Sequence, residues 1–383
     1  MRVLWVAHRG TLGGAELGLA EGVELLVARG HEVHVVLPRE GPLRARLTAA
    51  SGVHIRPHNP WMTPPAPARA RARWLAYNLL KARRDIARLA RELETDVVLT
   101  STITMPSGAF AARLAGVPHV WFIHEFGRED HGANFHLGGR LSMSLVDRLS
   151  EAVLANSKAV MRHFEPRLSP GKLRLIPYAV NVPPQPTAAD RPSSDPFTLV
   201  LSGEMTANKG QAEAIAALSL LVKAGLDVKL VLLGGGDPSY VTQLHSQAAE
   251  LAVSDRVRFL GFQPDPFPVI AAGDVGLMCS RHEALGRVTV EAMKLGRPVV
   301  GSASGGTVDL IRHGWNGLLY EPGSAPALAE QIELLYRDPA LAHEMGEHAR
   351  VWANETFNGE AYGAALEAAL DSAVQQHRAS ARR

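Results

Sequence analysis

The stretch VGLMCSRHEALGRVTVEAMKLGRPVVG, residues 275–301, contains one complete repeat of the pattern from which this chain is built. A short apolar run at 275–278 predicts a strand, and the spacing of apolar residues over 287–295 predicts a helix. A second apolar run at 298–301 predicts another strand. A strand, a helix and a strand in this order are typical of parallel sheets covered by helices, so the stretch predicts an α/β fold.

The same alternation continues on both sides of this stretch, in two series. Strands are predicted at 3–7, 32–37, 97–100, 119–123 and 152–155, and then at 198–201, 228–233, 257–260, 275–278, 298–301 and 317–320. Between the series, residues 181–197 read NVPPQPTAADRPSSDPF, the composition of a linker. We therefore expect two Rossmann-like, doubly wound parallel-sheet domains facing a cleft, where ligands of such sheets bind.

The linker and the strand series set the expected domain boundaries. The N-terminal domain covers residues 1–182, the linker 183–196 and the C-terminal domain 197–356. A further segment with helical spacing, about 357–376, is expected to pack back on the N-terminal domain.

Composition excludes several classes of protein. Of 383 residues, 46% are hydrophobic and 20% charged, which is typical of globular domains rather than disordered chains. No uninterrupted apolar run reaches the ~18 residues of a membrane span. Cys279 is the only cysteine, which excludes an intrachain disulfide and a thiolate metal cluster. The first apolar run is shorter than a signal-peptide core, so a cytoplasmic location is expected.

Charge divides unevenly between the halves. Residues 1–185 hold 24 Lys and Arg against 15 Asp and Glu, whereas the remainder holds 16 against 23. Eight of the basic residues fall within 69–91, interleaved with Trp74 and several leucines. This segment is expected to contact an anionic membrane surface peripherally or to hold a phosphorylated lipid acceptor. The alternative is a helix with an ordinary solvated face and an apolar side in the core. Nucleic acid is not an expected partner, because no aromatic platform accompanies the charge.

Several ligand motifs are absent. The first strand is followed by HRGTLGGAE, which lacks the Gly spacing of dinucleotide-binding folds, and no Walker A motif occurs. No Asp-x-Asp pair is present to hold a metal beside a diphosphate. We therefore expect no metal and no cofactor, and we expect peptide dipoles and cationic side chains to neutralise any bound diphosphate.

The segment 280–317 has the pattern of a sugar-nucleotide site. The peptide N–H groups of Leu285, Gly286 and Arg287 begin a helix and can bind a diphosphate. Glu283 lies just before them, where it can accept hydrogen bonds from a sugar, and Glu291 lies inside the helix, where it can bind a ribose diol. The alternative is that Glu283 only caps the helix and Glu291 lies on a solvated face.

With these residues the chain resembles the family-4 glycosyltransferases of GT-B fold. The resemblance rests on Glu283 and Glu291 as an E-x7-E pair followed by GRPVV and SGG, with GGAE at 13–16, IPYAVN at 176–181 and KGQ at 209–211. It implies a retaining, metal-independent transfer from a nucleotide-diphosphate sugar, UDP- or GDP-linked, to a glycan, a lipid-linked intermediate or a small molecule. A sugar-nucleotide epimerase or synthase and a non-catalytic sugar-nucleotide-binding protein remain alternatives.

The resemblance also implies roles in the C-terminal half. Lys209 is expected at the diphosphate and as a catalytic residue with Glu283, and Gly203 in the donor-binding loop after strand 198–201. Phe262 is expected in a base-binding loop, unless it is a core aromatic. Glu204 stands where the family usually has an arginine, and Arg287 is a candidate for the missing second cation.

The N-terminal half is expected to hold the acceptor. Gly13 and Gly14 follow the first strand and allow a ligand to approach the backbone, with Gly14 expected to contact the donor phosphates as well. Glu16 is either an acceptor contact or an acid favoured in the first turn of a helix. The resemblance places His124 near the reacting centre as a catalytic and acceptor-binding residue, the alternative being a buried histidine bonded to backbone.

Overall fold

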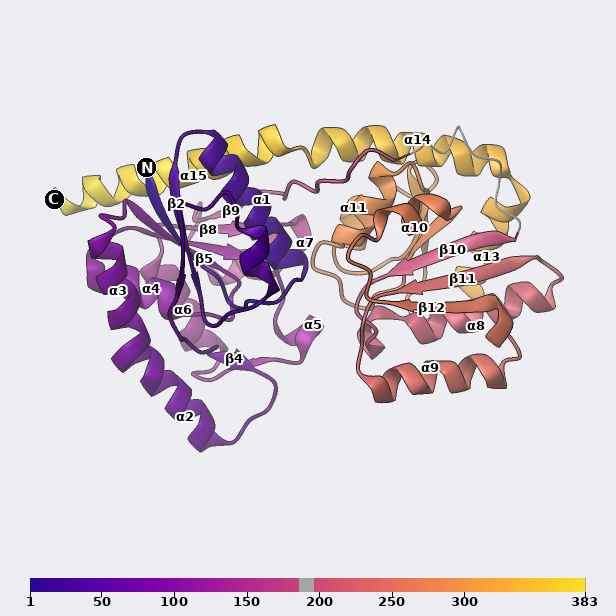
Figure 1. Cartoon of the computed structure of the whole chain (residues 1–383), viewed down its shortest axis with the longest axis horizontal. Coiled ribbons are helices and arrows are strands. Elements are labelled where there is room, and N and C mark those ends of the chain that lie inside the picture. Colours follow the sequence, from indigo (N-terminus) through magenta and orange to yellow (C-terminus); the bar gives the residue numbers. More distant parts are fainter. Residues whose placement is uncertain (186–195, 383) are drawn as a thin grey trace. The chain divides into compact units, whose positions relative to one another are not determined.

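The computed structural model describes residues 1–185 and 196–382, and it divides the chain into two compact units (Figure 1). Unit 1 comprises Met1–Ala179 and Phe357–Arg383, and unit 2 comprises Val180–Thr356. The linker predicted at 183–196 lies mostly outside the described residues. Each unit contains its own parallel sheet, so the α/β fold and the two Rossmann-like sheets expected from the sequence are confirmed.

The sheet of unit 1 has the order β3-β2-β1-β5-β6-β8-β9, and every pair is parallel. Its strands are β1 (Arg2–Val6), β2 (Glu32–Leu37), β3 (Gly52–Ile55), β5 (Val97–Ser101), β6 (His119–Ile123), β8 (Ala152–Ala155) and β9 (Leu173–Leu175). A separate antiparallel ribbon joins β4 (Met62–Thr63) and β7 (Asn134–Phe135). The central strands are buried along their length, as parallel strands covered on both faces must be.

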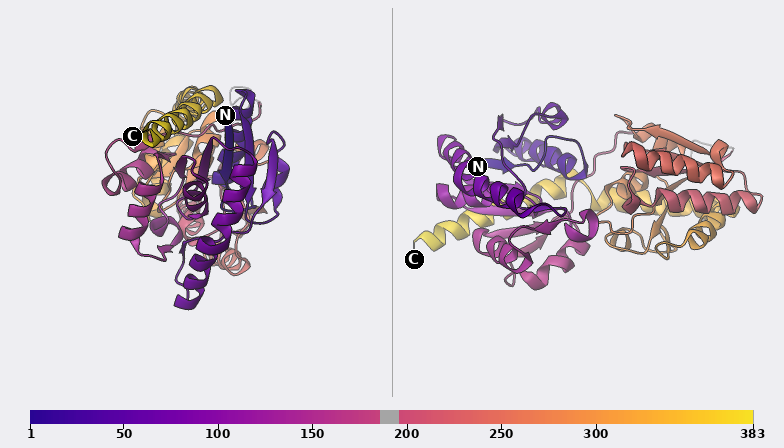
Figure 2. Two further views of the ribbon diagram at one scale, coloured as in Figure 1. Left: turned by 90° about the vertical axis from the view of Figure 1, so that its left-hand side faces the viewer. Right: turned by 90° about the horizontal axis from the view of Figure 1, so that it is seen from below.

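Eight helices of unit 1 are seen among the described residues. They are α1 (Gly14–Ala28), α2 (Ala68–Tyr77), α3 (Arg83–Glu92), α4 (Ser107–Ala115), α5 (Arg128–His131), α6 (Gly139–Leu149), α7 (Lys158–Phe164) and α15 (Gly359–Ala381). A π-helical turn, Asn78–Ala82, joins α2 to α3 in one long rod. Figure 2 shows the α2 end of this rod extending away from the sheet of unit 1.

The C-terminal helix α15 packs on unit 1 and continues past the expected end near 376 to Ala381. Polar contacts hold it along its length. Arg29 Nη2 lies 2.6 Å from Glu360 Oε1, and His31 Nε2 lies 2.7 Å from Glu367 Oε1. His377 Nδ1 lies 2.8 Å from Glu151 Oε1, and this contact lies within the last turns, which explains why they remain helical.

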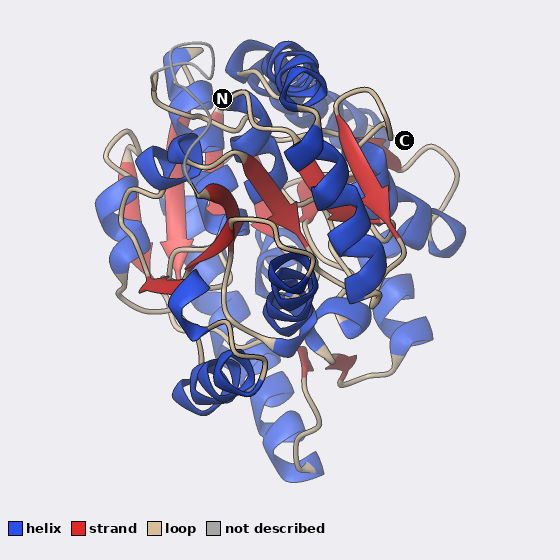
Figure 3. Cartoon of the chain, turned by 90° about the vertical axis from the view of Figure 1, so that its right-hand side faces the viewer, coloured by secondary structure: helices blue, strands red, loops and turns tan. Residues whose placement is uncertain are grey.

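The sheet of unit 2 has the order β12-β11-β10-β13-β14-β15, again with every pair parallel. Its strands are β10 (Phe197–Ser202), β11 (Val228–Leu233), β12 (Val257–Gly261), β13 (Val275–Met278), β14 (Val299–Ser302) and β15 (Gly317–Tyr320). Its helices are α8 (Gln211–Lys223), α9 (Pro238–Glu250), α10 (Phe267–Ala272), α11 (Arg287–Lys294), α12 (Thr307–Leu310), α13 (Ala325–Arg337) and α14 (Pro339–Thr356). Figure 3 shows helices on both sides of these strands.

Each unit has its core between its sheet and its helices. In unit 1, Trp5 and Trp121 are completely buried, and in unit 2 the same is true of Leu199, Leu230 and Val300. Burying one such side chain contributes ~1.5–3 kcal/mol to stability. None of the helices in the described part of the chain has both the length and the apolar character needed to cross a bilayer.

Both strand orders reverse at one point, between β1 and β5 in unit 1 and between β10 and β13 in unit 2. At such a point the connections after the two neighbouring strands run in opposite directions and leave a crevice at their carboxyl ends. The residues that follow these four strands are therefore the first to consider as a binding site.

Candidate active site

The crevice of unit 2 brings together two residues that the sequence singled out. Lys209 follows β10, and Glu283 follows β13. The Lys209 ammonium donates a hydrogen bond of 2.7 Å to Glu283 Oε2, with side-chain exposures of 32% and 14%. An ammonium has three N–H donors, of which Glu283 takes one, so Lys209 can also hold an anion.

The two loops that carry this pair are fastened to each other. The Arg281 amide donates to the Asn208 carbonyl at 2.9 Å, and the Asn208 side-chain amide donates to the His282 carbonyl at 3.2 Å. The glycines of the SGG motif pack against the same loop, because a Cβ on Gly305 would lie 2.4 Å from the Glu283 carbonyl oxygen. The backbone around Glu283 is therefore held on two sides.

The N-terminus of α11 opens beside this pair. Its N-cap is Gly286, whose φ of 84° is favourable only for glycine, and no described side chain caps the helix. The Glu283 side chain runs past it, since Glu283 Cγ is 3.3 Å from where a Gly286 Cβ would stand. Glu283 is thus paired with Lys209 rather than capping α11, so the capping alternative is wrong. The first-turn amides and the Lys209 ammonium are groups that can bind an anion, and their role in donor binding remains a prediction.

Glu291 lies inside α11 and is only 6% exposed, so the alternative that it lies on a solvated face is wrong. Arg287, one turn earlier, donates from Nε to Glu291 Oε1 at 3.0 Å, and both side chains are almost fully buried. The sequence offered Arg287 as a second cation for a diphosphate. In the structure its guanidinium is engaged by Glu291, which indicates a role in orienting that carboxylate.

Phe262 follows β12 and is 65% exposed, which makes the core-aromatic alternative wrong. An exposed ring after a strand of this sheet suits stacking against a flat ligand such as a nucleotide base. Glu204 is exposed after Gly203 at the end of β10, and Leu285 is buried. The role of each of these residues in donor binding remains a prediction.

A glycine run that was not predicted from the sequence to belong to the site lies beside these loops. Residues 234–236 follow β11, and a Cβ on Gly234 would lie 1.9 Å from the Gly203 carbonyl oxygen. The Met205 amide donates to the Gly235 carbonyl at 2.7 Å. Three glycines in a row after a predicted strand are a readable signal of close backbone approach.

In unit 1, His124 immediately follows β6 and is 7% exposed. Burial lowers the pKa of His124 to about 3, so the ring is neutral at physiological pH. The Tyr178 hydroxyl hydrogen-bonds to His124 Nδ1, and His124 Nε2 has no hydrogen-bond partner among the described residues. The His124 ring is therefore hydrogen-bonded to a side chain rather than to backbone. The alternative of a buried histidine bonded to backbone is thus right about burial and wrong about the bonding partner.

Tyr178 was missed at the sequence level, although it lies in the IPYAVN motif. Its ring packs against α1 at Gly18, where a Cβ would lie 2.8 Å from the ring. Tyr362 from α15 meets it edge-on, with ring centroids 6.0 Å apart. The C-terminal helix thus supports the tyrosine that holds His124.

Glu16 lies in the first turn of α1 but is 4% exposed. Its Oε1 is 3.1 Å from His8 Nε2, and burial raises the pKa of its carboxyl. Gly13 packs against it, because a Cβ on Gly13 would lie 2.8 Å from Glu16 Oε2, and Gly14 begins α1. Glu16 is therefore a buried polar group of the crevice as well as an acid in a first helical turn.

Glu125 is a second buried carboxyl that the sequence analysis missed. Burial, followed by the neighbouring Asp130 charge, raises the pKa of Glu125 to about 8. Its Oε1 accepts a 2.7 Å hydrogen bond from the Ile103 amide, in the connection after β5. Glu125 lies two residues after a predicted strand, and no sequence motif marks it as a site residue.

The predicted site residues thus divide between the units. Unit 2 contains every predicted donor-binding residue except Gly14, namely Gly203, Lys209, Phe262, Glu283, Leu285, Gly286, Arg287 and Glu291. Unit 1 contains Gly13, Gly14, Glu16 and His124. Within each unit the residues gather at the carboxyl ends of the strands, where the expected donor and acceptor half-sites belong.

Comparison with known protein families gives one match for each half of the chain. Residues 12–182 match the model of Glycosyltransferase Family 4, and residues 187–352 match that of Glycosyl transferases group 1. Together the two matches contain every predicted site residue.

Two curated relatives are similar over part of the chain. The lipopolysaccharide core biosynthesis glycosyltransferase LpsE of Rhizobium meliloti is 37% identical over 45% of this chain and 47% of its own length. The N-acetyl-alpha-D-glucosaminyl L-malate synthase of Bacillus anthracis is 38% identical over 35% of each chain. The chain therefore spans between a third and a half of the length of these relatives.

The fold of the whole chain matches solved structures. Anabaena Alr3699/HepE, solved in complex with UDP, superposes with a TM-score of 0.79, 24% identity and coverage of 97% of this chain and 100% of that one. WaaG, a glycosyltransferase involved in lipopolysaccharide biosynthesis, superposes with a TM-score of 0.67 at 18% identity, over 97% of this chain and 99% of that one. These likenesses establish the two-domain fold.

Proposed function

The chain belongs to the family-4 type of GT-B glycosyltransferases, and from this premise we propose that it transfers a sugar from a nucleotide-diphosphate sugar to an acceptor. The observation that carries the proposal is the contact of Lys209 with Glu283 beside the open N-terminus of α11. This contact combines a cation, backbone N–H donors and a carboxylate, which are the groups that bind a diphosphate and a sugar hydroxyl.

We propose the following arrangement of the donor. The diphosphate lies at the α11 amides and Lys209, the sugar hydroxyls donate to Glu283, and the ribose diol donates to Glu291. Phe262 stacks on the base. UDP is the first nucleotide to test because HepE was solved with UDP, and GDP is the second.

The proposed chemistry is departure of the nucleoside diphosphate from the sugar. As the bond between the anomeric carbon and the phosphate oxygen breaks, negative charge grows on that oxygen and positive charge on the sugar. The α11 amides and Lys209 stabilise the leaving phosphate more in the transition state than in the ground state. We propose attack from the same face with the leaving phosphate accepting the acceptor's proton, which retains the anomeric configuration.

We propose that this transfer needs no divalent metal. The charge of the diphosphate is met by the Lys209 ammonium and by peptide N–H groups at the end of α11, which do not dissociate when a chelator is added. The test is donor turnover with and without chelator.

In unit 1 we propose that the acceptor is a glycan, a lipid-linked intermediate or a small molecule. His124 is neutral at physiological pH, so its Nε2 can donate to or accept from a hydroxyl but cannot supply a positive charge. Tyr178 keeps the ring in one orientation. His124 thus orients a hydroxyl group, on either the donor sugar or the acceptor.

We also propose that the α2–α3 rod contacts anionic membrane from the cytoplasmic side. Its exposed residues include Arg69, Arg73, Lys81, Arg84, Arg88 and Arg91. Its apolar residues Ile86 and Leu89 are buried in unit 1, although Leu80 is 59% exposed. The proposed contact is therefore an electrostatic attraction to lipid headgroups rather than an insertion into the bilayer. Cosedimentation with anionic but not with zwitterionic vesicles would support it.

The catalytic proposal is tested by incubating the protein with UDP- and GDP-sugars in the presence of EDTA. Slow donor hydrolysis is expected, because water can replace an absent acceptor, and the first anomer released should match that of the donor. Donor binding without any turnover would favour a non-catalytic binding protein, and release of the opposite anomer would contradict retention.

A further inference from the structure

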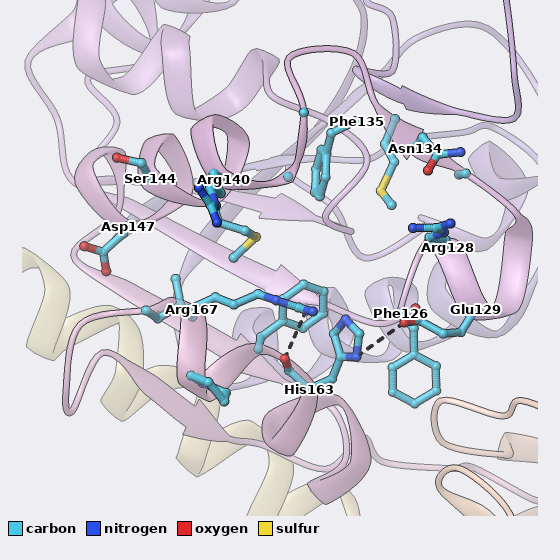
Figure 4. Close-up of a pocket in the computed structure, with 18 of the residues that line it drawn as sticks. Phe126, Arg128, Glu129, Asn134, Phe135, Arg140, Ser144, Asp147, His163 and Arg167 are labelled. Carbon is cyan, nitrogen blue, oxygen red and sulfur yellow. Dashed lines mark hydrogen bonds and ion pairs between the residues drawn. The ribbon is translucent and has the colours of Figure 1, made fainter.

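Unit 1 contains a cavity of about 850 Å³ that no predicted site residue lines. Its walls come from the segment that follows His124, from the β4–β7 ribbon, from α6 and from the end of α7 (Figure 4). Phe126, two residues after His124, is part of the lining. The cavity therefore begins on the same loop as the proposed hydroxyl-orienting histidine.

The inner wall of the cavity is apolar. Met62 of the ribbon, Phe126, Met143 of α6 and Phe164 of α7 all line it, and each is at least nine-tenths buried. Methionine and phenylalanine side chains present no hydrogen-bonding groups and adapt to flexible apolar ligands. This wall suits a hydrocarbon chain rather than a sugar.

The rim of the cavity carries three guanidinium groups, those of Arg128, Arg140 and Arg167. Figure 4 shows them coming from separate sides of the space, with Arg167 extending toward His163. Arg167 donates to the His163 carbonyl and lies over the Phe164 ring. Within residues 1–185 and 196–382, no carboxylate lies at ion-pair distance from Arg128 or Arg140.

One of the two carboxylates of the lining is already engaged. Asp147 accepts from both the amide and the hydroxyl of Ser169, at 2.8 and 2.7 Å, and lies 3.8 Å from the Lys172 ammonium. Glu129 lies 3.9 Å from the His163 ring, which is beyond hydrogen-bond distance. Because neither carboxylate forms an ion pair with Arg128 or Arg140, these two guanidinium groups can bind an anion from outside the unit.

The ribbon connects this cavity to the basic rod. Met62 lies in β4, which pairs with β7 and leads along the chain into α2. Trp74 of α2 stacks on His136, next to β7, with ring centroids 5.7 Å apart. The ribbon thus lines the cavity and also contacts the proposed membrane-facing rod, which favours a ligand that comes from a membrane.

We propose that this cavity binds a lipid phosphate, with its phosphate held by Arg128 and Arg140 and its hydrocarbon chain against the apolar wall. This inference rests on the proposed function in two respects, that the α2–α3 rod faces a membrane and that such a lipid would be the acceptor or its carrier. It names the lipid-linked class among the proposed acceptors. Binding itself needs no turnover and can be measured separately.

The experiment is titration calorimetry of the full chain with decyl phosphate, kept below its micelle concentration, with inorganic phosphate and decanol as comparison ligands. The test variant is Arg128→Gln combined with Arg140→Gln. The matched control is Arg148→Gln, an exposed arginine of α6 outside the lining. Nucleoside diphosphate binding is measured on the same samples.

Decyl phosphate should bind more tightly than either comparison ligand. The double variant should weaken it by about tenfold or more, and Arg148→Gln should leave it within about twofold, the effect usual for a surface change. Equal binding of inorganic phosphate, equal binding of decanol, or undiminished binding by the double variant would overturn the proposal. In the wild type, absence of decyl phosphate binding together with intact nucleoside diphosphate binding would refute the cavity assignment alone, whereas absence of nucleoside diphosphate binding in the wild type would refute the proposed function.

Discussion

The buried ion pair of Arg287 and Glu291 allows the donor half-site to be tested by one substitution, Glu291→Ala. The two side chains are 10% and 8% exposed, so the change leaves a buried guanidinium without this carboxylate. Breaking a buried pair from one side costs ~3–5 kcal/mol, whereas an exposed pair contributes ~1 kcal/mol or less. At about 2–4 °C per kcal/mol for a domain of this size, we expect unit 2 to melt roughly 6–20 °C lower.

The assay is differential scanning calorimetry, and α13 supplies a matched control. Arg337 and Glu333 form an exposed pair with the same i, i+4 spacing, and their side chains are 64% and 35% exposed. Glu333→Ala should therefore change the melting temperature by no more than about 4 °C. Equal melting temperatures for Glu333→Ala and Glu291→Ala would refute the assignment of a buried, structurally coupled carboxylate.

Nucleotide binding by the same variants separates two roles for Arg287. If it orients Glu291, Arg287→Ala and Glu291→Ala should each weaken nucleoside diphosphate binding, and the double variant should be little worse than either. If it instead contacts the leaving phosphate, Arg287→Ala should lower kcat more than donor affinity. The 3.0 Å contact leads us to expect the first result. Additive losses in the double variant would contradict it.

Three further outcomes are expected. Tyr178→Phe removes the hydrogen bond to His124 and should lower the free energy of unfolding by ~0.5–1.5 kcal/mol in urea titrations, with donor affinity unchanged. Glu125→Gln should stabilise the protein relative to wild type near pH 8 more than near pH 5. The folded-state pKa of about 8 lies above the ordinary value, so the wild type loses stability as pH rises toward it. Gly305→Ala places a Cβ 2.4 Å from the Glu283 carbonyl at a φ of 53°, and should weaken nucleotide binding measured by calorimetry. A wild-type value for the respective quantity would count against each expectation.

The sequence predicted the central strands well, because apolar runs bounded by turn residues are strong where both faces of a strand are buried. It missed β3 and β9, whose residues are only partly buried at the two edges of their sheet. An edge strand needs fewer apolar residues, so its pattern is weak.

Motif spacing identified Lys209 and Glu283 but not their contact. They are 74 residues apart, and only the adjacency of β10 and β13 brings their loops together. The ion pair of Arg287 with Glu291 could have been predicted, because residues four apart on a helix lie on the same face. The hydrogen bond between Tyr178 and His124 could not have been predicted, since it joins two loops through side-chain orientations that no local sequence pattern encodes.

The cavity of unit 1 had no sequence signal at all. Its walls come from five separate segments between Met62 and Ser169, and no motif links them. Its arginines resemble surface arginines in the sequence, and only their position around an apolar wall distinguishes them.

The central claim is that Lys209, Glu283 and the start of α11 bind the diphosphate of a sugar nucleotide. Titration calorimetry of UDP, GDP, ADP and TDP with wild type and Lys209→Ala, all in EDTA, tests it most directly. We predict that at least one of these nucleotides binds in EDTA, and that Lys209→Ala weakens its binding by about tenfold or more, the loss of a charge-assisted hydrogen bond. Binding that requires a divalent metal, or that is unchanged in Lys209→Ala, would contradict the claim.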